Sequence, residues 1–238
     1  MHDLHDFLMP VSTHTLNEDD NFNDGQLAKQ IAIYENQLPD ISNIDIVLVG
    51  VTETRGCGII ESSVNSADSI RKELYQLYSW HPAVKIADMG NIKTGASLSD
   101  SYAAIQTVVA ELMRLNKVVI IIGGSHDITL AQYHAYKELQ QIIEATCIDA
   151  TIDLKAESLS RSENFLMEML TSEPNFIRHY NHIGFQSYYI HPHMLETMDK
   201  LRFDCYRVGA AKENIEEMEP VLRNTNLLSF DISDIKFS

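Results

Sequence analysis

The sequence lacks any apolar stretch long enough to cross a membrane, and it lacks a recognisable secretory signal. Its longest unbroken apolar run is Val118–Ile122, whereas a spanning helix needs about 20 residues. The first residues, 1–4, contain neither a basic segment nor an apolar run. Cysteine is also scarce: Cys57, Cys147 and Cys205 show no metal-ligand spacing, and their odd number argues against a disulfide framework. We therefore expect a cytoplasmic protein.

Basic residues are few. The 238 residues include 18 Lys+Arg against 34 Asp+Glu, which gives a formal net charge of −16. Such a surface repels phosphate backbones and anionic membranes, so neither nucleic acid nor a membrane is expected as a partner. The same charge would attract cationic substrates or metal ions, although an acidic surface can also serve solubility alone.

Internal repeats, low-complexity segments and Pro/Gly-rich linkers are absent, so one domain is the simplest interpretation. Residues 1–40 are polar and irregular apart from a helical pattern at 26–37, and we interpret them as an N-terminal extension. From residue 41 to 238, short β-branched runs alternate with amphipathic stretches, which predicts an α/β fold whose mostly parallel sheet is covered on both faces. Strands are expected at 44–51, 84–89, 118–122, 145–149, 182–185, 205–208 and 227–232, and helices at 66–78, 100–115, 129–139, 163–170, 192–201 and 214–222.

Three of the expected strands end in polar residues, and in open α/β folds ligands bind at the carboxyl ends of strands. The first end reads Gly123-Gly124-Ser125-His126-Asp127. The glycines by themselves could supply only a tight turn. No Gly-Lys-Ser/Thr follows them, which excludes a phosphate-binding P-loop.

The other two strand ends carry carboxylates. In an extended chain, residues two apart share a face, which would place Asp149, Thr151 and Asp153 together. Carboxylates that project together repel unless a cation or hydrogen bonds compensate them, although such aspartates can also cap helices. The third end places Asp231 and Ser233 on one face, where the aspartate could equally form a turn.

Taken together, Gly-Gly-x-His, then Asp-Ala-x-x-Asp about two dozen residues later, then Ser-Phe-Asp resemble the ureohydrolase family of arginase, agmatinase and formimidoylglutamase. Ile70–Tyr75 resembles the first helix of that family. The resemblance covers most of residues 44–238 and is closest to formimidoylglutamase-like proteins. It implies a three-layer, arginase-like α/β/α fold, a homo-oligomer, and hydrolysis of guanidino or formimino groups by hydroxide held between two Mn²⁺ ions.

The resemblance also implies metal ligands. The family has six, and the four matched here are His126, Asp149, Asp153 and Asp231. Thr151 and Ser233 replace the other two, which belong to the same one of the two metal sites. A neutral hydroxyl is a poor ligand beside imidazole or carboxylate, so we expect one Mn²⁺ rather than two. Asp127 is the candidate catalytic residue, because it could orient His126 or a nearby water.

Two further departures concern the family's catalytic and substrate-binding loops. Residues 154–169 contain no histidine, whereas the family usually carries a catalytic one there. The family's substrate-binding glutamate lies well beyond the Ser-Phe-Asp strand, but this sequence stops at Ser238, and two more strands would be expected. We therefore expect a fragment, or a chain completed by another segment that contains those strands.

The leading interpretation is a metal-dependent hydrolase of a linear C–N bond in a small amidine or guanidino substrate. The alternative is a catalytically inactive relative that keeps the fold and acts as a binding or assembly subunit, because the replaced ligands remove one side of the hydroxide bridge. Two other features are weaker candidates. Cys57 has no recognisable His/Asp partner as a nucleophile, and His191 and His193 fit a solvated turn better than a metal site.

Overall fold

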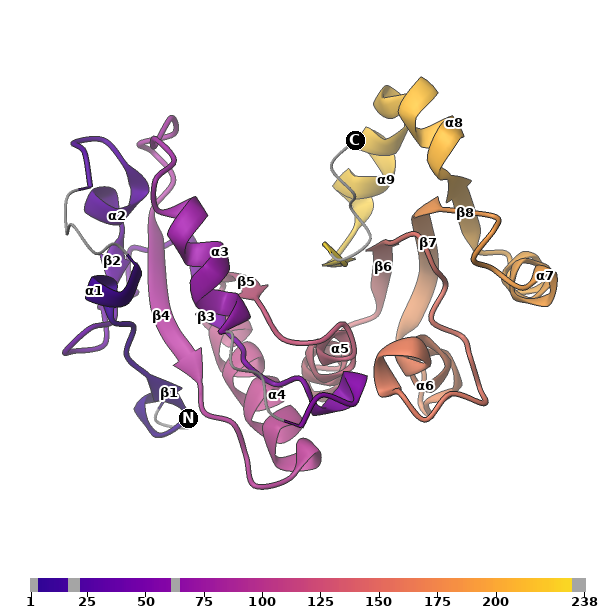
Figure 1. The fold of residues 1–238 in the computed structure, drawn as a ribbon, viewed down its shortest axis with the longest axis horizontal. Helices are drawn as coiled ribbons and strands as arrows, with labels where there is room; N and C mark the ends of the chain where they lie inside the picture. Colours follow the sequence, from indigo (N-terminus) through magenta and orange to yellow (C-terminus); the bar gives the residue numbers. More distant parts are fainter. Residues whose placement is uncertain (1–3, 17–21, 61–64, 233–238) are drawn as a thin grey trace. The chain divides into compact units, whose positions relative to one another are not determined.

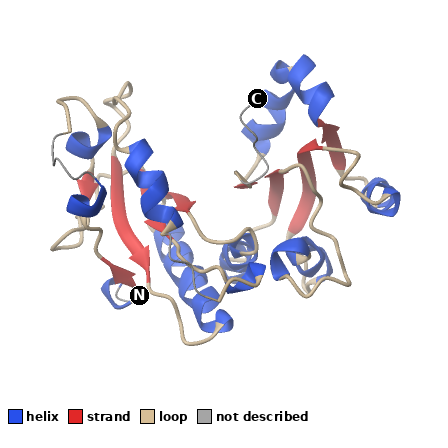
Figure 2. Ribbon diagram, viewed as in Figure 1, coloured by secondary structure: helices blue, strands red, loops and turns tan. Residues whose placement is uncertain are grey.

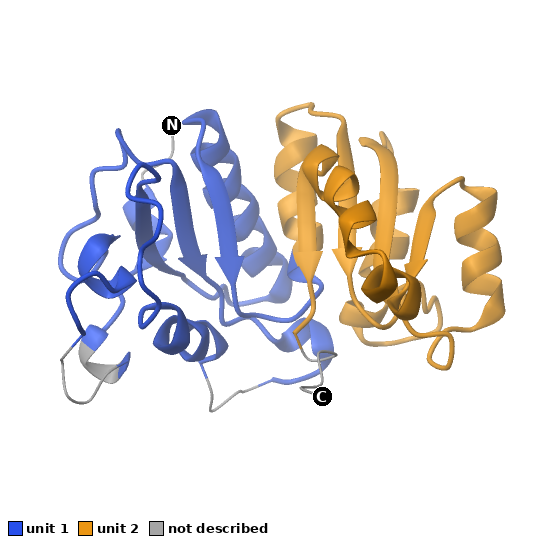
Figure 3. Ribbon diagram, turned by 90° about the horizontal axis from the view of Figure 1, so that it is seen from above, with its two compact units in different colours: residues 1–128 blue, residues 129–238 orange. Residues whose placement is uncertain are grey.

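Aliphatic runs such as 46–49 and 118–122 form strands, and amphipathic segments such as 98–114 form helices (Figures 1 and 2). The structure is a computed structural model that describes residues 4–16, 22–60 and 65–232. The chain divides into two compact units, residues 1–128 and 129–238, shown in blue and orange in Figure 3. Each unit is an α/β structure of its own, with its own sheet and its own helices.

The first unit contains a five-stranded sheet with the order β1-β4-β3-β5, in which β2 also pairs with β4. All pairs are parallel except β1 with β4, which is antiparallel. Its strands are β1 (Leu8–Met9), β2 (Ala32–Ile33), β3 (Ile46–Gly50), β4 (Ile86–Ile92) and β5 (Val118–Ile122). Its helices are α1 (Thr13–Leu16), α2 (Leu27–Gln30), α3 (Ser66–Leu74) and α4 (Leu98–Arg114), with short 3-10 turns η1 (Leu4–Asp6) and η2 (Arg55–Cys57).

The second unit contains a four-stranded sheet with the order β8-β7-β6-β9, in which every pair is parallel. Its strands are β6 (Ile143–Ile148), β7 (Ile177–Phe185), β8 (Asp204–Arg207) and β9 (Leu227–Phe230). Its helices are α5 (Ile128–Glu138), which starts at the unit boundary, α6 (Phe165–Thr171), α7 (Pro192–Lys200), α8 (Val208–Glu213) and α9 (Met218–Asn224), with 3-10 turns η3 (Arg161–Glu163) and η4 (Ile215–Glu217). In each unit, helices lie in front of and behind the strands (Figure 3).

A buried ion pair ties α3 to β4 in the first unit. Arg71 and Asp88 are both fully buried, and the guanidinium Nε and Nη2 atoms donate to the two carboxylate oxygens at 2.8 and 2.9 Å. The Tyr75 hydroxyl donates to the same carboxylate at 3.0 Å, and Asn91 accepts a further guanidinium hydrogen bond at 2.6 Å. Because every charged group has partners, the pair is compatible with a position inside the core.

The α/β fold predicted from the sequence, with mostly parallel strands and flanking helices, is confirmed. Several boundaries differ. The expected helix at 26–37 is the short α2, followed directly by β2, and residues 208–213 form α8, which the pattern did not predict. β7 begins at Ile177, five residues before the predicted start at 182, because pairing with β6 extends it through a polar sequence.

The strands at one end of each sheet carry partly exposed apolar side chains. β5 ends the order of the first sheet and β9 ends that of the second. Val118 and Ile120 on β5 are 60% and 41% exposed, and Leu228 and Phe230 on β9 are 49% and 47% exposed.

Among the helices of the described residues, none is long and apolar enough to cross a membrane.

Candidate metal centre

The turn after β5 presents the candidate histidine of the first unit. Gly123 and Gly124 both have positive φ, 81° and 78°, and a Cβ on Gly123 would lie 2.7 Å from the amide of Ala67. Only glycine fits such a backbone without strain. The Ser125 amide donates to the Glu53 carbonyl at 2.9 Å, which holds the turn against the loop that follows β3. His126 comes next and is partly exposed.

Asp127 lies immediately after His126 and is fully buried. Its carboxylate accepts a hydrogen bond from the hydroxyl of Tyr102 on α4. It also packs directly on Gly56, where an added Cβ would lie 1.9 Å from the Asp127 Oδ2 atom. The histidine turn is thus held by α4 and by the η2 loop, and Asp127 contacts both.

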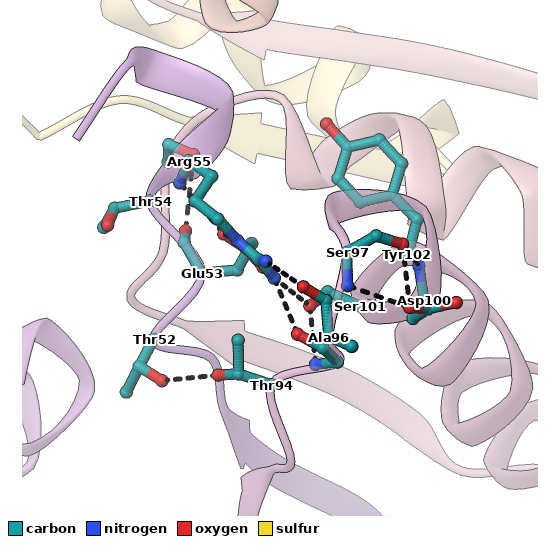
Figure 4. A network of polar contacts seen from close by, with 12 residues as sticks. Thr52, Glu53, Thr54, Arg55, Thr94, Ala96, Ser97, Asp100, Ser101 and Tyr102 are labelled. Atoms are coloured by element: carbon teal, nitrogen blue, oxygen red, sulfur yellow. Dashed lines mark hydrogen bonds and ion pairs between the residues drawn. The ribbon is translucent and has the colours of Figure 1, made fainter. Parts of the chain in front are cut away.

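A second network holds the η2 loop itself (Figure 4). The Arg55 guanidinium binds the Glu53 carboxylate, with Nε and Nη2 at 2.9 and 2.5 Å from its two oxygens. Nη1 donates to the Ala96 carbonyl at 2.8 Å, and Nη2 donates to Gly95 and to Ser101 at 2.9 and 3.1 Å. Arg55 therefore connects the loop after β3 with the loop after β4.

Glu53 is charged in this network despite its burial. Burial raises the pKa of Glu53, but hydrogen bonds from Arg55 and Ser101, the Arg55 amide and the Arg55 charge outweigh it and lower the pKa to about 2. The carboxylate is only 2% exposed. It is therefore ionised throughout the neutral range, and its partner Arg55 is held as a cation.

The candidate carboxylates of the second unit follow two neighbouring strands. The register pairs Ile148 of β6 with Phe230 of β9, so Asp149 and Asp231 come directly after paired residues. The Asp231 amide donates to the Ile148 carbonyl at 3.1 Å, which extends the pairing by one residue. Carboxyl ends of parallel strands meet at one edge of a sheet, so both aspartates belong to the same edge.

Asp149 is 5% exposed and Asp153 is 7% exposed, whereas Asp231 is partly exposed. Buried carboxylates are costly without a compensating cation or donors. Their oxygens are the hard donors that suit Mn²⁺ or Mg²⁺, so the donor chemistry of this edge fits the metal that the family resemblance implies.

The segment after Asp149 is a turn and not a continued strand. β6 ends at Ile148, and the Thr151 amide and hydroxyl donate to Asp149 Oδ1 at 2.9 and 3.3 Å. The two-residue alternation that predicted a shared face for Asp149, Thr151 and Asp153 therefore does not apply. The Asp149 side chain accepts the Thr151 amide hydrogen bond that a neighbouring strand would accept in a continued sheet. Aspartate commonly forms turns by accepting a hydrogen bond from the backbone two residues further on.

A buried imidazole reaches the same turn from β7. His182 Nε2 lies 3.0 Å from the Asp149 carbonyl oxygen, and Nδ1 lies 3.1 Å from the Tyr180 hydroxyl. Burial alone would lower the pKa of His182, but a hydrogen bond and charge interaction with Cys147 and the interaction with Asp149 raise the pKa above its ordinary value. Burial, together with Cys147 and Asp153, raises the pKa of Tyr180, which therefore stays a neutral hydroxyl.

The candidate residues are thus all placed at or just after strand ends. His126 and Asp127 belong to the first unit, and Asp149, Asp153 and Asp231 belong to the second. Ser233 lies outside the described residues. The weaker candidate Cys57 donates its thiol hydrogen to the Thr54 carbonyl at 3.0 Å.

The residues that hold the candidate ligands and their turns lie outside the motifs recognised in the sequence. These are Glu53, Arg55, Gly56, Tyr102, Tyr180 and His182. One available signal was position, because Glu53, Arg55 and Gly56 follow the carboxyl end of β3, where the strand-end rule also applies. Tyr102 on α4, and Tyr180 and His182 on β7, lie far from the ligand motifs in the sequence, and no local sequence pattern indicates that they contact the ligands.

Comparisons with known proteins point in one direction. A sequence model of the arginase family matches residues 44–236. The formimidoylglutamase of Macrococcus caseolyticus is 28% identical over 170 residues, which cover 66% of this chain and 52% of that protein. The formimidoylglutamase of Staphylococcus haemolyticus is 28% identical over 111 residues, which cover 45% of this chain and 36% of that protein. The chain thus spans about half the length, or less, of these relatives.

Solved structures show the same fold. Trypanosoma cruzi formiminoglutamase with Mn²⁺ gives a TM-score of 0.74 at 14% identity, covering 90% of this chain and 77% of that one. The formimidoylglutamase of Bacillus subtilis gives a TM-score of 0.71 at 17% identity, covering 89% and 71%. These likenesses establish the arginase-like fold, and the match over residues 44–236 establishes the family. The resemblance predicted from the three strand ends is confirmed: the chain belongs to the arginase family.

Proposed function

We propose that this chain is a Mn²⁺-dependent hydrolase of a linear C–N bond in a small formimino or guanidino compound. The observation that carries the proposal is the pair Asp149 and Asp231, which follow in-register residues of adjacent parallel strands. Buried Asp153 in the same segment adds a third carboxylate. The formimidoylglutamase relatives support the formimino group as the first substrate class to test.

Each candidate residue has a distinct role in this proposal. His126, Asp149, Asp153 and Asp231 would hold the ion, and a bound Mn²⁺ would activate water for attack on the amidine carbon. Asp127 does not contact bulk solvent, because it is fully buried against Gly56 and Tyr102. It acts instead by fixing the backbone turn from which His126 projects.

We propose one ion per chain, although the T. cruzi relative was solved with two Mn²⁺ ions. The support comes from Thr151, which occupies a ligand position of the family's other site. Its hydroxyl donates to Asp149 Oδ1, so its proton points toward the candidate ligand. A hydroxyl used as a donor to a carboxylate, and neutral in any case, is a poor replacement for an imidazole ligand.

The test is hydrolysis by the purified protein after metal removal and after reloading with Mn²⁺. N-formimidoyl-L-glutamate, arginine and agmatine are the substrates, and substrate loss is followed by chromatography. We expect Mn²⁺-dependent turnover of at least one of them, lowered 100-fold or more by Asp149→Asn or Asp231→Asn. Asp204→Asn is the matched control, because Asp204 starts β8 at the amino end of the strand and is exposed.

Two negative outcomes have different meanings. Protein that binds Mn²⁺ but turns over none of the three substrates would contradict the hydrolase proposal and favour a binding subunit. Protein that binds no Mn²⁺ would contradict the metal centre as well.

A further inference from the structure

β7 places two polar side chains, Tyr180 and His182, in the core of the second unit. Neither is among the proposed metal ligands, so their burial needs another explanation. Tyr180 and His182 are 3% and 1% exposed, and they lie two residues apart on the same strand. They therefore share one face of the sheet. An imidazole in such a place is costly unless its nitrogen atoms have partners, so the identity of those partners indicates what the side chain does.

The hydrogen-bond donors and acceptors of this pair follow from the atoms involved. A main-chain carbonyl can only accept, so His182 Nε2 carries the proton and donates to the Asp149 oxygen at 3.0 Å. The hydroxyl of Tyr180 lies 3.1 Å from Nδ1 on the other side of the ring. The ring is therefore held at both nitrogen atoms, with one of them bound to the main chain of a candidate metal ligand.

Asp149 needs such a partner because it lies just beyond the regular ladder. β6 ends at Ile148, and the Asp149 amide makes one last bond to the Ile183 carbonyl at 3.1 Å. The His182 bond takes the carbonyl of the same residue, so both polar groups of its main chain are fixed by β7. Thr151 then holds Oδ1 from within the turn at 2.9 Å.

We infer that His182 is a positioning residue of the metal centre, which aims the Asp149 carboxylate by holding its main-chain carbonyl, with Tyr180 fixing the imidazole. This inference rests on the proposed role of Asp149 as a ligand. Groups that orient metal ligands typically change metal affinity by about 10- to 100-fold when they are removed. Here the orientation acts through the peptide backbone, while the carboxylate remains available to the ion.

The experiment measures Mn²⁺ affinity in the full chain, from the electron paramagnetic resonance signal of free Mn²⁺ during titration. His182→Phe keeps the ring and removes the donor, and we expect its dissociation constant to rise about 10-fold or more. His182→Gln carries an amide N–H about as far from the main chain as imidazole Nε2, and it should restore most of the affinity. Tyr180→Phe should give a smaller loss, because the ring keeps its bond to Asp149.

The control separates positioning from general stability. Thr146 is buried on β6 and bonds Thr225 at 2.5 Å, so Thr146→Val disturbs the same strand without touching Asp149. Urea unfolding of the metal-free variants records the loss of stability for each. We expect Thr146→Val to lose stability but keep the Mn²⁺ affinity of the parent.

Each remaining outcome decides the inference. Folded His182→Phe with the affinity of the parent would overturn it and leave the proposed function standing. If His182→Phe does not fold, His182→Gln and Tyr180→Phe decide: parental affinity in His182→Gln with a loss in Tyr180→Phe supports the inference, and any other pattern overturns it. A parent that binds no Mn²⁺ would overturn the proposed function, and the positioning role with it.

Discussion

Glu53 combines near-complete burial with a full negative charge, because Arg55 and Ser101 surround its carboxylate. The main chain of the same residue holds the histidine turn, through the bond from the Ser125 amide at 2.9 Å. One residue thus connects an ion pair, whose strength depends on pH, with the backbone that carries His126. The state of the ion pair should therefore be visible in the stability of the first unit.

The folded-state pKa of Glu53 is lowered to about 2 from an ordinary value of 4.5, so its contribution to stability is fully present above about pH 4.5. It is lost as the pH falls from 4.5 toward 2. We expect Glu53→Gln to cost on the order of 1–2 kcal/mol at pH 6, since partial exposure of Arg55 screens the pair, and to cost progressively less toward pH 2. Urea unfolding from pH 2 to 6 measures this, and the exposed Glu157→Gln serves as control. A cost that does not change with pH would contradict the assignment.

The sequence could not have predicted this network, although it predicted the ligand turn. Two glycines followed by a histidine after an apolar run form a local pattern, and each of those residues has a local reason. Glu53 and Arg55 are two residues apart in a polar loop, and their partners Gly95 and Ser101 lie some 40 residues away. Only the packed structure brings such partners together.

At the scale of secondary-structure elements, a fully buried ion pair joins α3 to β4. Arg71 and Asp88 are both 0% exposed. Burial lowers the pKa of Arg71, but the Asp88 carboxylate more than offsets this and keeps the pKa above its ordinary value. Removing one partner would leave the other as a buried charge without compensation.

We expect Arg71→Met to destabilise the protein by roughly 3–5 kcal/mol, because Asp88 would lose its compensating cation. Adding Asp88→Asn to that variant should recover part of the loss, since the neutral amide costs less to bury. Urea unfolding of the parent, both single variants and the double variant gives the coupling. The exposed pair of Arg223 and Glu219 on α9 is the matched control, and Arg223→Met should cost less than about 1 kcal/mol. Strictly additive losses from Arg71→Met and Asp88→Asn would contradict the prediction.

Helices and strands were predictable where the periodicity of apolar residues is strong. They were less predictable where pairing with a neighbouring strand sets the bounds of the element. β3 and β5 are aliphatic runs, and α4 is amphipathic and begins with a capping box of Ser97 and Asp100. β7 begins at Ile177 and continues through the mostly polar residues 178–181, where pairing with the neighbouring strand β6 keeps the chain extended. The end of β6 at Ile148 was missed because the Asp149 turn is formed by side-chain bonds that apolar periodicity does not reveal.

At the scale of the whole molecule, the family was predictable because its ligands are local in sequence. Each candidate ligand lies within a few residues of a recognisable strand, so order and spacing were enough to indicate the arginase family. Strand order was not predictable in the same way. β9 is the last strand in the sequence but pairs with β6, with some 80 residues between the partners, and parallel pairing leaves no local signature.

The proposed single ion per chain would distinguish this protein from the T. cruzi formiminoglutamase, which was solved with two Mn²⁺ ions. We expect elemental analysis after dialysis against excess Mn²⁺ to give one equivalent for the parent. Thr151→His combined with Ser233→Asp supplies an imidazole and a carboxylate at the two positions where the sequence lacks the family's metal ligands. The double variant should therefore bind more Mn²⁺ per chain than the parent. In the absence of metal, the added carboxylate should destabilise the double variant on the order of 1 kcal/mol by like-charge repulsion. Its Mn²⁺-induced shift in melting temperature should then exceed that of the parent, because an ion that binds the native state stabilises it.

The control for this prediction comes from the turn after β6. Thr151→His also removes the hydroxyl bond to Asp149 Oδ1, so a change could reflect that loss alone. Thr151→Val removes the same bond without adding a ligand, and it keeps the amide bond at 2.9 Å. If the valine variant matches the parent in stoichiometry and in melting shift while the double variant exceeds both, the added ligands are responsible. Two equivalents in the parent would contradict the single-ion proposal, and equal shifts in parent and double variant would mean that the second site was lost through more than two side chains.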